Sequence, residues 1–131
     1  MKDLMRARTS LQEEVEKLLN DQIKMEARSS ASYLAMASWC DRNGFDYSAD
    51  FFYKQSDEER GHMLKIFKYV SDLGGRAISP EILSVPQEFE SFKDVFEKAL
   101  EQEIAARVRS ACVARDPVRR RRAPSAAGRD E

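Results

Sequence analysis

The chain has 131 residues, of which 34% are charged and 42% are hydrophobic, and its formal net charge is −1. This composition is typical of one small soluble domain built from amphipathic helices. It excludes a membrane-spanning protein, because no apolar run is long enough, and a disulfide scaffold, because there are 2 cysteines. The first residues lack the apolar stretch of a signal peptide, so we expect a cytoplasmic protein.

Charges are distributed unevenly along the chain. Residues 1–104 carry 14 Lys and Arg against 20 Asp and Glu, a net charge of −6. Residues 105–131 carry 8 Arg, no Lys and 3 acidic residues, a net charge of +5, and the two parts sum to −1. We therefore divide the chain into a folded part, residues 1–104, and an Arg-, Ala- and Pro-rich tail that we expect to be disordered.

The first predicted helix runs from about Ser10 to about Arg42. Apolar and small residues recur there in alternating steps of three and four, which is the helical period. Asn43 and Gly44 supply a stop signal, and no Pro or Gly interrupts the segment before them. The inward row of this helix comprises Leu19, Ile23, Glu26, Ser30, Tyr33, Ala37 and Cys40. A helix of this length is typical of a helical bundle.

A second helix is predicted from Asp46, a good N-cap residue, to Gly74 and Gly75, where glycine suits the left-handed cap position. Its inward row comprises Ser48, Phe52, Gln55, Glu59, His62, Ile66, Tyr69 and Leu73. Two residues of this row, Glu59 and His62, can bind metal and stand one turn apart on the same face. The short turn after the first helix makes the two helices antiparallel neighbours.

Residues 75–90 contain Pro80 and Pro86 and have no helical period, so they are predicted to form a long connection. Such a connection can carry the chain back along the bundle, so that the next helix starts at the opposite end. A capping signal at residues 91–94 marks the start of the third helix. The inward row of that helix comprises Phe92, Phe96, Ala99 and Glu103.

After Ile104 the amphipathic pattern fades, and Pro117 and Pro124 prevent a continuous helix. The sequence therefore predicts no fourth amphipathic helix. The arginines at residues 119–122 could suggest a nucleic-acid-binding patch, but no aromatic residue interleaves them and no folded element presents them. We expect neither a nucleic-acid partner nor a membrane partner.

Carboxylates fall on the inward rows of all three predicted helices, at Glu26, Glu59 and Glu103. A buried carboxylate requires a partner that pairs with its charge. Carboxylates from separate helices, together with a Glu-x-x-His step such as Glu59–His62, are the ligands with which helical bundles build di-iron sites. Taken singly, His62 is more often a core or surface histidine, and each glutamate is more often a solvated charge. The combination favours an iron site.

Three stretches of the chain resemble the bacterial non-haem ferritins. They are residues 26–33 (EARSSASY), residues 57–63 (DEERGHM) and residues 96–103 (FEKALEQE). The spacings, 33 residues from Glu26 to Glu59 and 44 residues from Glu59 to Glu103, also fit that family. The resemblance covers residues 10–104. It implies an all-α fold, a ferritin-like four-helix bundle with a long crossover between its second and third helices, of which the fourth helix is missing here.

The resemblance implies a ferroxidase centre that holds two non-haem irons. Glu59 would bridge the two metal ions. Glu26 and His62 would bind the first iron, and Glu103 would bind the second. Carboxylates are hard donors that stabilise ferric iron, and a single imidazole leaves coordination positions open for oxygen or peroxide.

Two further residues have roles that the resemblance implies. Tyr33 would stand beside the centre as a hydrogen-bonding group or a local electron donor, and it is explained as well by a place in the core. Glu58 would bind a third iron nearby, or it is an ordinary surface acid. Haem is not implied, because Phe52 and Gln55 stand where a haem ferritin would need a methionine.

The implied function is iron storage, in which ferrous iron is oxidised by oxygen or peroxide and deposited as ferric mineral. The implied partners are further copies of the chain in a homo-oligomer, or other ferritin subunits. Ferritins close the bundle with a fourth helix that supplies a further Gln or Glu ligand. The change to arginine alone after residue 104 is what an out-of-frame reading of GC-rich coding sequence would produce, so we expect a truncated or frame-shifted ferritin. The alternative is a non-catalytic remnant that binds iron weakly or only pairs with full-length ferritin subunits.

Overall fold

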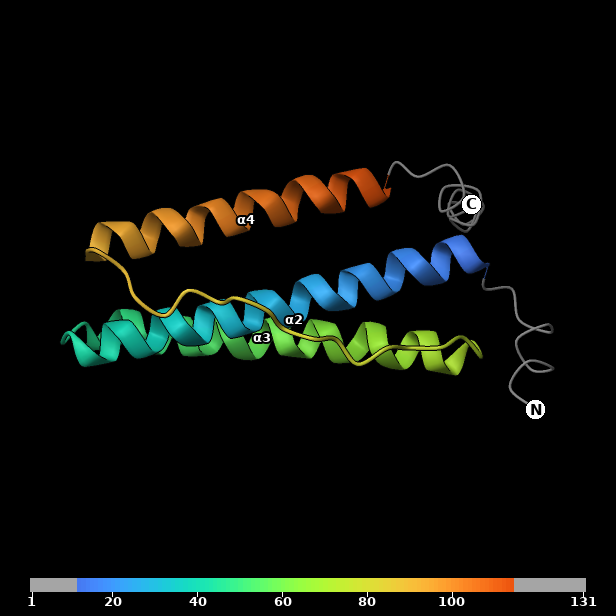
Figure 1. Cartoon of the computed structure of the whole chain (residues 1–131), viewed down its shortest axis with the longest axis horizontal. Helices are drawn as coiled ribbons and strands as arrows, with labels where there is room; N and C mark the ends of the chain where they lie inside the picture. Colours follow the sequence, from blue (N-terminus) through green and yellow to red (C-terminus); the bar gives the residue numbers. More distant parts are fainter. Residues whose placement is uncertain (1–11, 115–131) are drawn as a thin grey trace, which may run out of the picture. The chain divides into compact units, whose positions relative to one another are not determined.

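The computed structural model describes residues 12–114, and in this range it contains three α-helices and no β-strand (Figure 1). They are α2 (Glu13–Arg42), α3 (Asp46–Asp72) and α4 (Phe92–Ala114). The prediction of an all-α fold is confirmed. Within these residues, no helix has both the length and the apolar character that crossing a membrane requires.

The chain divides into two compact units. The first ends at Phe96 and contains α2, α3, the connection that follows α3 and the first turn of α4. The second begins at Glu97 and contains the rest of α4. The polar cluster described below lies entirely within the first unit.

Helices α2 and α3 form an antiparallel hairpin and lie side by side (Figure 1). Between them Gly44 adopts φ +83°, a conformation that residues with a Cβ rarely tolerate. The Phe45 N–H donates to the Cys40 carbonyl at 2.9 Å. The Gly44 N–H donates to the Asp41 carbonyl at 3.3 Å, which completes a Schellman motif. The stop predicted at Asn43 and Gly44 is confirmed.

The connection from α3 to α4 begins and ends at helix caps. Gly74 has φ +81° and donates its N–H to the Ser71 carbonyl at 3.0 Å, so glycine also ends α3. At the other end, the Asp94 N–H donates to Ser91 Oγ at 3.1 Å. The Glu90 N–H donates to Oδ2 of Asp94 at 3.1 Å. This pair is the capping interaction predicted at the start of the third helix.

The connection runs back along the hairpin, as the sequence predicts for a crossover, and polar side chains of α2 hold it (Figure 1). Near the start of α2, the Asn20 side chain bonds the backbone of residues 76–78 through one donor and one acceptor, each at 2.9 Å. In the middle of α2, Arg28 donates to the carbonyls of residues 83 and 84. These bonds satisfy backbone groups of a segment that has no regular structure.

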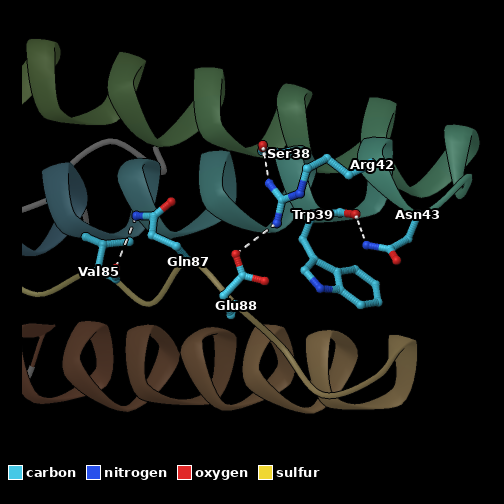
Figure 2. A network of polar contacts seen from close by, with 7 residues as sticks. All are labelled: Ser38, Trp39, Arg42, Asn43, Val85, Gln87 and Glu88. Atoms are coloured by element: carbon cyan, nitrogen blue, oxygen red, sulfur yellow. Dashed lines mark hydrogen bonds and ion pairs between the residues drawn. The ribbon is translucent and has the colours of Figure 1, made fainter.

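A third attachment lies near the end of α2, where Figure 2 shows the polar contacts around Arg42. Arg42 forms an ion pair with Glu88 at 3.2 Å and donates to Ser38 Oγ at 3.0 Å. The side chain of the next residue, Asn43, donates to the Trp39 carbonyl at 2.8 Å. The crossover is therefore fastened at both ends and in the middle of α2.

Two apolar clusters pack the first unit. One is aromatic and joins α2, α3 and the start of α4. Its rings belong to Tyr33, Trp39, Phe45, Phe51, Phe52, Phe89, Phe92 and Phe96. The other centres on Ile23 and Val70, which are fully buried, near the opposite end of the hairpin. The stretch of α2 and α3 between these clusters carries the polar cluster described below.

Helix α4 continues to Ala114, ten residues beyond Ile104, where we expected the ordered part to end. Residues 105–114 contain no Pro and no Gly, and Ala and Arg are strong helix formers. Local propensity therefore extends the helix although the amphipathic pattern has faded, and the predicted boundary at residue 104 is corrected. Two predictions lie outside the described residues, namely the remainder of the tail at 115–131 and the helix start at Ser10.

Candidate metal centre

Three of the predicted ligands come together between α2 and α3. Glu26 lies in the middle of α2, and Glu59 and His62 lie one turn apart on α3. Nδ1 of His62 is 3.8 Å from Oε2 of Glu26 and 3.7 Å from Oε2 of Glu59. One potential ligand atom from each of the three residues lies within 4.8 Å of the other two. Two carboxylate oxygens and one imidazole nitrogen thus face a common point.

The register between the two helices is set by a pair of serines one turn away from the cluster. Ser30 Oγ donates to the Ser56 carbonyl at 2.7 Å, and Ser56 Oγ donates to the Ser30 carbonyl at 2.7 Å. These reciprocal bonds join two helix backbones at a point where both side chains are small, so the helices approach closely. Because Ser30 follows Glu26 by one turn and Ser56 precedes Glu59 by one turn, the register brings the carboxylates together.

Burial makes this arrangement unfavourable unless a cation is present. The side chains of Glu26 and Glu59 are 16% and 17% exposed, whereas that of His62 is 56% exposed. Two carboxylates that are largely removed from water and close to each other repel, and a bound cation would offset this repulsion. The more exposed imidazole leaves one side of the cluster accessible from solvent.

The donor set fits a divalent transition metal. A metal about 2.1 Å from each donor holds neighbouring donors about 3–3.5 Å apart. The separations of 3.7 and 3.8 Å from Nδ1 of His62 require the side chains to contract by a few tenths of an ångström, and the two carboxylate oxygens, which lie within 4.8 Å of each other, have to approach further. Oxygen and imidazole donors suit iron, manganese and zinc. The cluster can therefore hold one such ion once the side chains of Glu26 and Glu59 rotate toward each other.

The other predicted site residues lie elsewhere. Tyr33 is buried on α2, two turns beyond Glu26, and its ring stacks on Phe52 with centroids 5.9 Å apart. Glu58 is exposed on α3 and is not part of the cluster. Glu103 lies on α4 in the second unit, so its assignment to the second iron stays a prediction.

One contact at the cluster was not anticipated from the sequence. Gln22, one turn before Glu26 on α2, donates from Nε2 to Oε1 of Glu26 at 2.9 Å. The sequence did carry a signal, since residues four apart on a helix face each other and a Gln beside a carboxylate is a favourable pair. The signal was weak because such pairs are common on helices that bind no metal.

A helical hairpin with carboxylates and a histidine at its centre is typical of the bundle proteins that carry di-iron sites. Comparison with known proteins narrows this class. The sequence model of the ferritin-like domain matches residues 16–111, which is most of the chain. The chain belongs to the ferritin family.

Its relatives agree with the predicted resemblance to bacterial non-haem ferritins, which is confirmed. The chain is 42% identical over 93 residues to a probable bacterial non-heme ferritin-like protein of Haemophilus influenzae, covering 71% of this chain and 56% of that protein. It is 38% identical over 93 residues to a bacterial non-heme ferritin of Staphylococcus epidermidis, with the same coverage. The chain therefore spans about half the length of these curated relatives.

Solved ferritin structures are similar to the chain as well. A humanized archaeal ferritin has a TM-score of 0.79 and 31% identity, covering 86% of this chain and 68% of that one. An open pore ferritin from Archaeoglobus fulgidus has a TM-score of 0.79 and 30% identity, covering 86% of this chain and 69% of that one. The fold class predicted from the sequence, a ferritin-like helical bundle, is confirmed.

Proposed function

We propose that the chain is an iron-storage ferritin subunit that binds ferrous iron at Glu26, Glu59 and His62 and oxidises it. One observation carries the proposal, namely the convergence of these three side chains from two helices within 4.8 Å. Carboxylate pairs that are largely buried seldom occur without a cation, and family membership makes iron the leading candidate.

Each residue of the cluster has a part in the proposed reaction. Glu26 and Glu59 supply anionic oxygens, which bind ferric iron more strongly than ferrous iron and so favour the loss of an electron. His62 supplies a neutral nitrogen and occupies one position, which leaves other positions open for the oxidant. Each ferrous ion loses one electron, oxygen or peroxide accepts the electrons, and the ferric product is deposited as mineral.

The second iron and its neighbours complete the proposal. Glu59 has two carboxylate oxygens, so it would help to hold a second iron, for which Glu103 of α4 would supply a further ligand. Tyr33 acts as a hydrogen-bonding group or a local electron donor from its buried position beside Phe52. A third iron near Glu58 is a weaker part of the proposal, because that side chain is exposed and outside the cluster.

Storage of ferric mineral requires a confined volume, so we propose that the chain assembles with further copies of itself or with other ferritin subunits in the cytoplasm. The other partner that we propose is a full-length ferritin subunit, because the chain belongs to the same family. Pairing without oxidation is the second candidate function. It predicts association with full-length ferritin subunits but no ferroxidase turnover.

Titration with ferrous iron under nitrogen, followed by mixing with aerated buffer, tests the proposal. We expect saturable binding of ferrous iron and rapid formation of ferric absorbance, both lost in His62→Ala. Glu58→Gln is the matched control, because it removes a carboxylate from the same helix outside the cluster, and it should leave the first binding step unchanged. Binding that survives His62→Ala unaltered would overturn the assignment, and binding without oxidation would favour the pairing function.

A further inference from the structure

Gln22 occupies a defined place beside the cluster. It lies on α2 one turn before Glu26, and its side chain is partly buried. Its Nε2 donates to Oε1 of Glu26 at 2.9 Å, whereas Oε2 of the same carboxylate is the oxygen 3.8 Å from Nδ1 of His62. The two oxygens of Glu26 are therefore distinguished, one bonded to the amide and the other directed to the cluster.

We propose that Gln22 is a positioning residue that fixes Glu26 as a metal ligand through a single oxygen, Oε2. This inference rests on the metal-binding role proposed above. A carboxylate with both oxygens available can bind a metal through either or both. When Oε1 is engaged by an N–H donor, the carboxylate is held in one rotation and presents Oε2. Hydrogen bonds to ligand side chains commonly tune metal affinity in this way.

The direction of the hydrogen bond follows from chemistry. An amide has a donor end and an acceptor end, and a carboxylate only accepts. If the amide of Gln22 were turned around, its oxygen would face Oε1 of Glu26, and the two acceptors would repel. The bond also joins residues of the same helix, so it forms as soon as α2 forms and needs no adjustment between helices. Gln22 therefore orients the carboxylate before a metal arrives.

A second glutamine, in a matching position on the other helix, does not make the contact that Gln22 makes. Gln55 lies on α3 one turn before Glu59, the same offset that separates Gln22 from Glu26. Both glutamines are partly buried. Among the described residues, the Gln55 side chain has no hydrogen bond to Glu59 or to any other group. The two positions thus share residue type, offset and burial, and they differ in the hydrogen bond.

This difference supplies the experiment. Gln22→Met and Gln55→Met each replace the amide by an apolar side chain of similar length that suits a helix. Zinc binding to the full chain is measured by calorimetry, and cobalt binding is followed by the visible spectrum, which reports the number and geometry of the ligands. We expect Gln22→Met to weaken zinc binding roughly tenfold or more and to change the cobalt spectrum. Gln55→Met should leave both unchanged.

The outcomes separate this inference from the proposed function. If the unmodified chain binds neither zinc nor cobalt, or if His62→Ala binds both equally well, the metal site itself is refuted. If the unmodified chain binds and His62→Ala does not, but Gln22→Met matches Gln55→Met in affinity and spectrum, the role of Gln22 is refuted.

A measurement on the unmodified chain covers the case in which Gln22→Met fails to fold. The side-chain amide resonances of Gln22 and Gln55 are followed by NMR as zinc is added. The Gln22 resonances should shift on binding and exchange slowly with solvent, because their N–H is engaged by a metal ligand. Gln22 resonances that stay in place while zinc binds would overturn the inference.

Discussion

Replacement of Glu59 by Gln should stabilise the metal-free protein and at the same time abolish its stabilisation by metal. The reason is the proximity of Glu26 and Glu59, whose ligand oxygens lie within 4.8 Å of each other. Both side chains are largely buried, so water screens their mutual repulsion only in part. A binding site often keeps charged residues that lower the stability of the empty protein, because the ligand needs them.

The size of the effect can be bounded. Two unit charges about 5 Å apart repel by about 1 kcal/mol in bulk water and by about 3.5 kcal/mol at the effective dielectric constant of a protein surface. The side chain of His62 is 56% exposed, so water reaches the cluster, whereas the two glutamates are largely buried; the bulk-water value is therefore the minimum expected. We therefore expect Glu59→Gln to raise the free energy of unfolding by at least about 1 kcal/mol, which corresponds to a rise in Tm of roughly 4 °C or more for a small domain.

The assay is thermal unfolding of the full chain with and without zinc, with all variants in the same buffer. Zinc at a hundredfold excess over its Kd should stabilise the unmodified chain by about 2.7 kcal/mol. Glu59→Gln should lose this increment. Asp57→Asn, which neutralises an exposed acid of the same helix that has no proposed metal role, should change neither the metal-free Tm nor the increment. A lower metal-free Tm for Glu59→Gln, or an increment that survives, would show that the two carboxylates do not form one site.

Three further predictions concern the scaffold. Phe52→Ala should lower the free energy of unfolding by about 3–5 kcal/mol in urea denaturation, because Phe52 is fully buried between α2, α3 and the start of α4; a loss below about 1 kcal/mol would contradict the packing described. Gly44→Ala should lower the free energy of unfolding by about 1 kcal/mol, because residue 44 has a positive φ. Gly61→Ala should raise it by about 0.5–1 kcal/mol, because residue 61 lies in the middle of α3 and a Cβ added there meets open space. The two variants must change the free energy of unfolding in opposite directions in the same denaturation assay, or this account of the two glycines is wrong. Burial raises the pKa of the Cys40 thiol, so less of the thiol is ionised at a given pH. Iodoacetamide should therefore label Cys40 slowly in the folded protein and rapidly in urea, as followed by mass spectrometry. Fast labelling of folded protein would show that the hairpin opens.

Most of the helical framework could be predicted from the sequence. The ends of α2 and α3 depend on glycines whose hydrogen bonds are made within a few residues, so Gly44 and Gly74 identify them. The start of α4 likewise depends on Ser91 and Asp94, three residues apart. The end of α4 was misplaced because loss of the amphipathic pattern was taken as loss of the helix, whereas Ala and Arg extend a helix by propensity alone.

The candidate site was predicted in part. The step from Glu59 to His62 is local, so the sequence places both side chains on one face of α3 without any knowledge of the fold. Glu26 was singled out by its place on the inward row of the other helix, and the resemblance to ferritins assigned it to the same iron as His62. The contact between Gln22 and Glu26 was not predicted. It bears on the site only because the other oxygen of that carboxylate, Oε2, faces His62, and this requires the tertiary structure.

The sequence by itself determined where α2 and α3 end, where α4 begins and which residues share a face, because these depend on groups a few positions apart along one chain. It did not identify the cap of α3, because Asp46, the predicted N-cap, is the first helical residue and Phe45 precedes it. The tertiary structure decided how far α2 and α3 slide past each other, and the reciprocal bonds between Ser30 and Ser56 fix that register. A shift of one helical turn is about 5.4 Å, which exceeds the separations within the cluster. Pattern alone cannot distinguish such registers, since each would bury a similar apolar surface. The packed hairpin distinguishes them, and it brings Glu26 to Glu59 and His62.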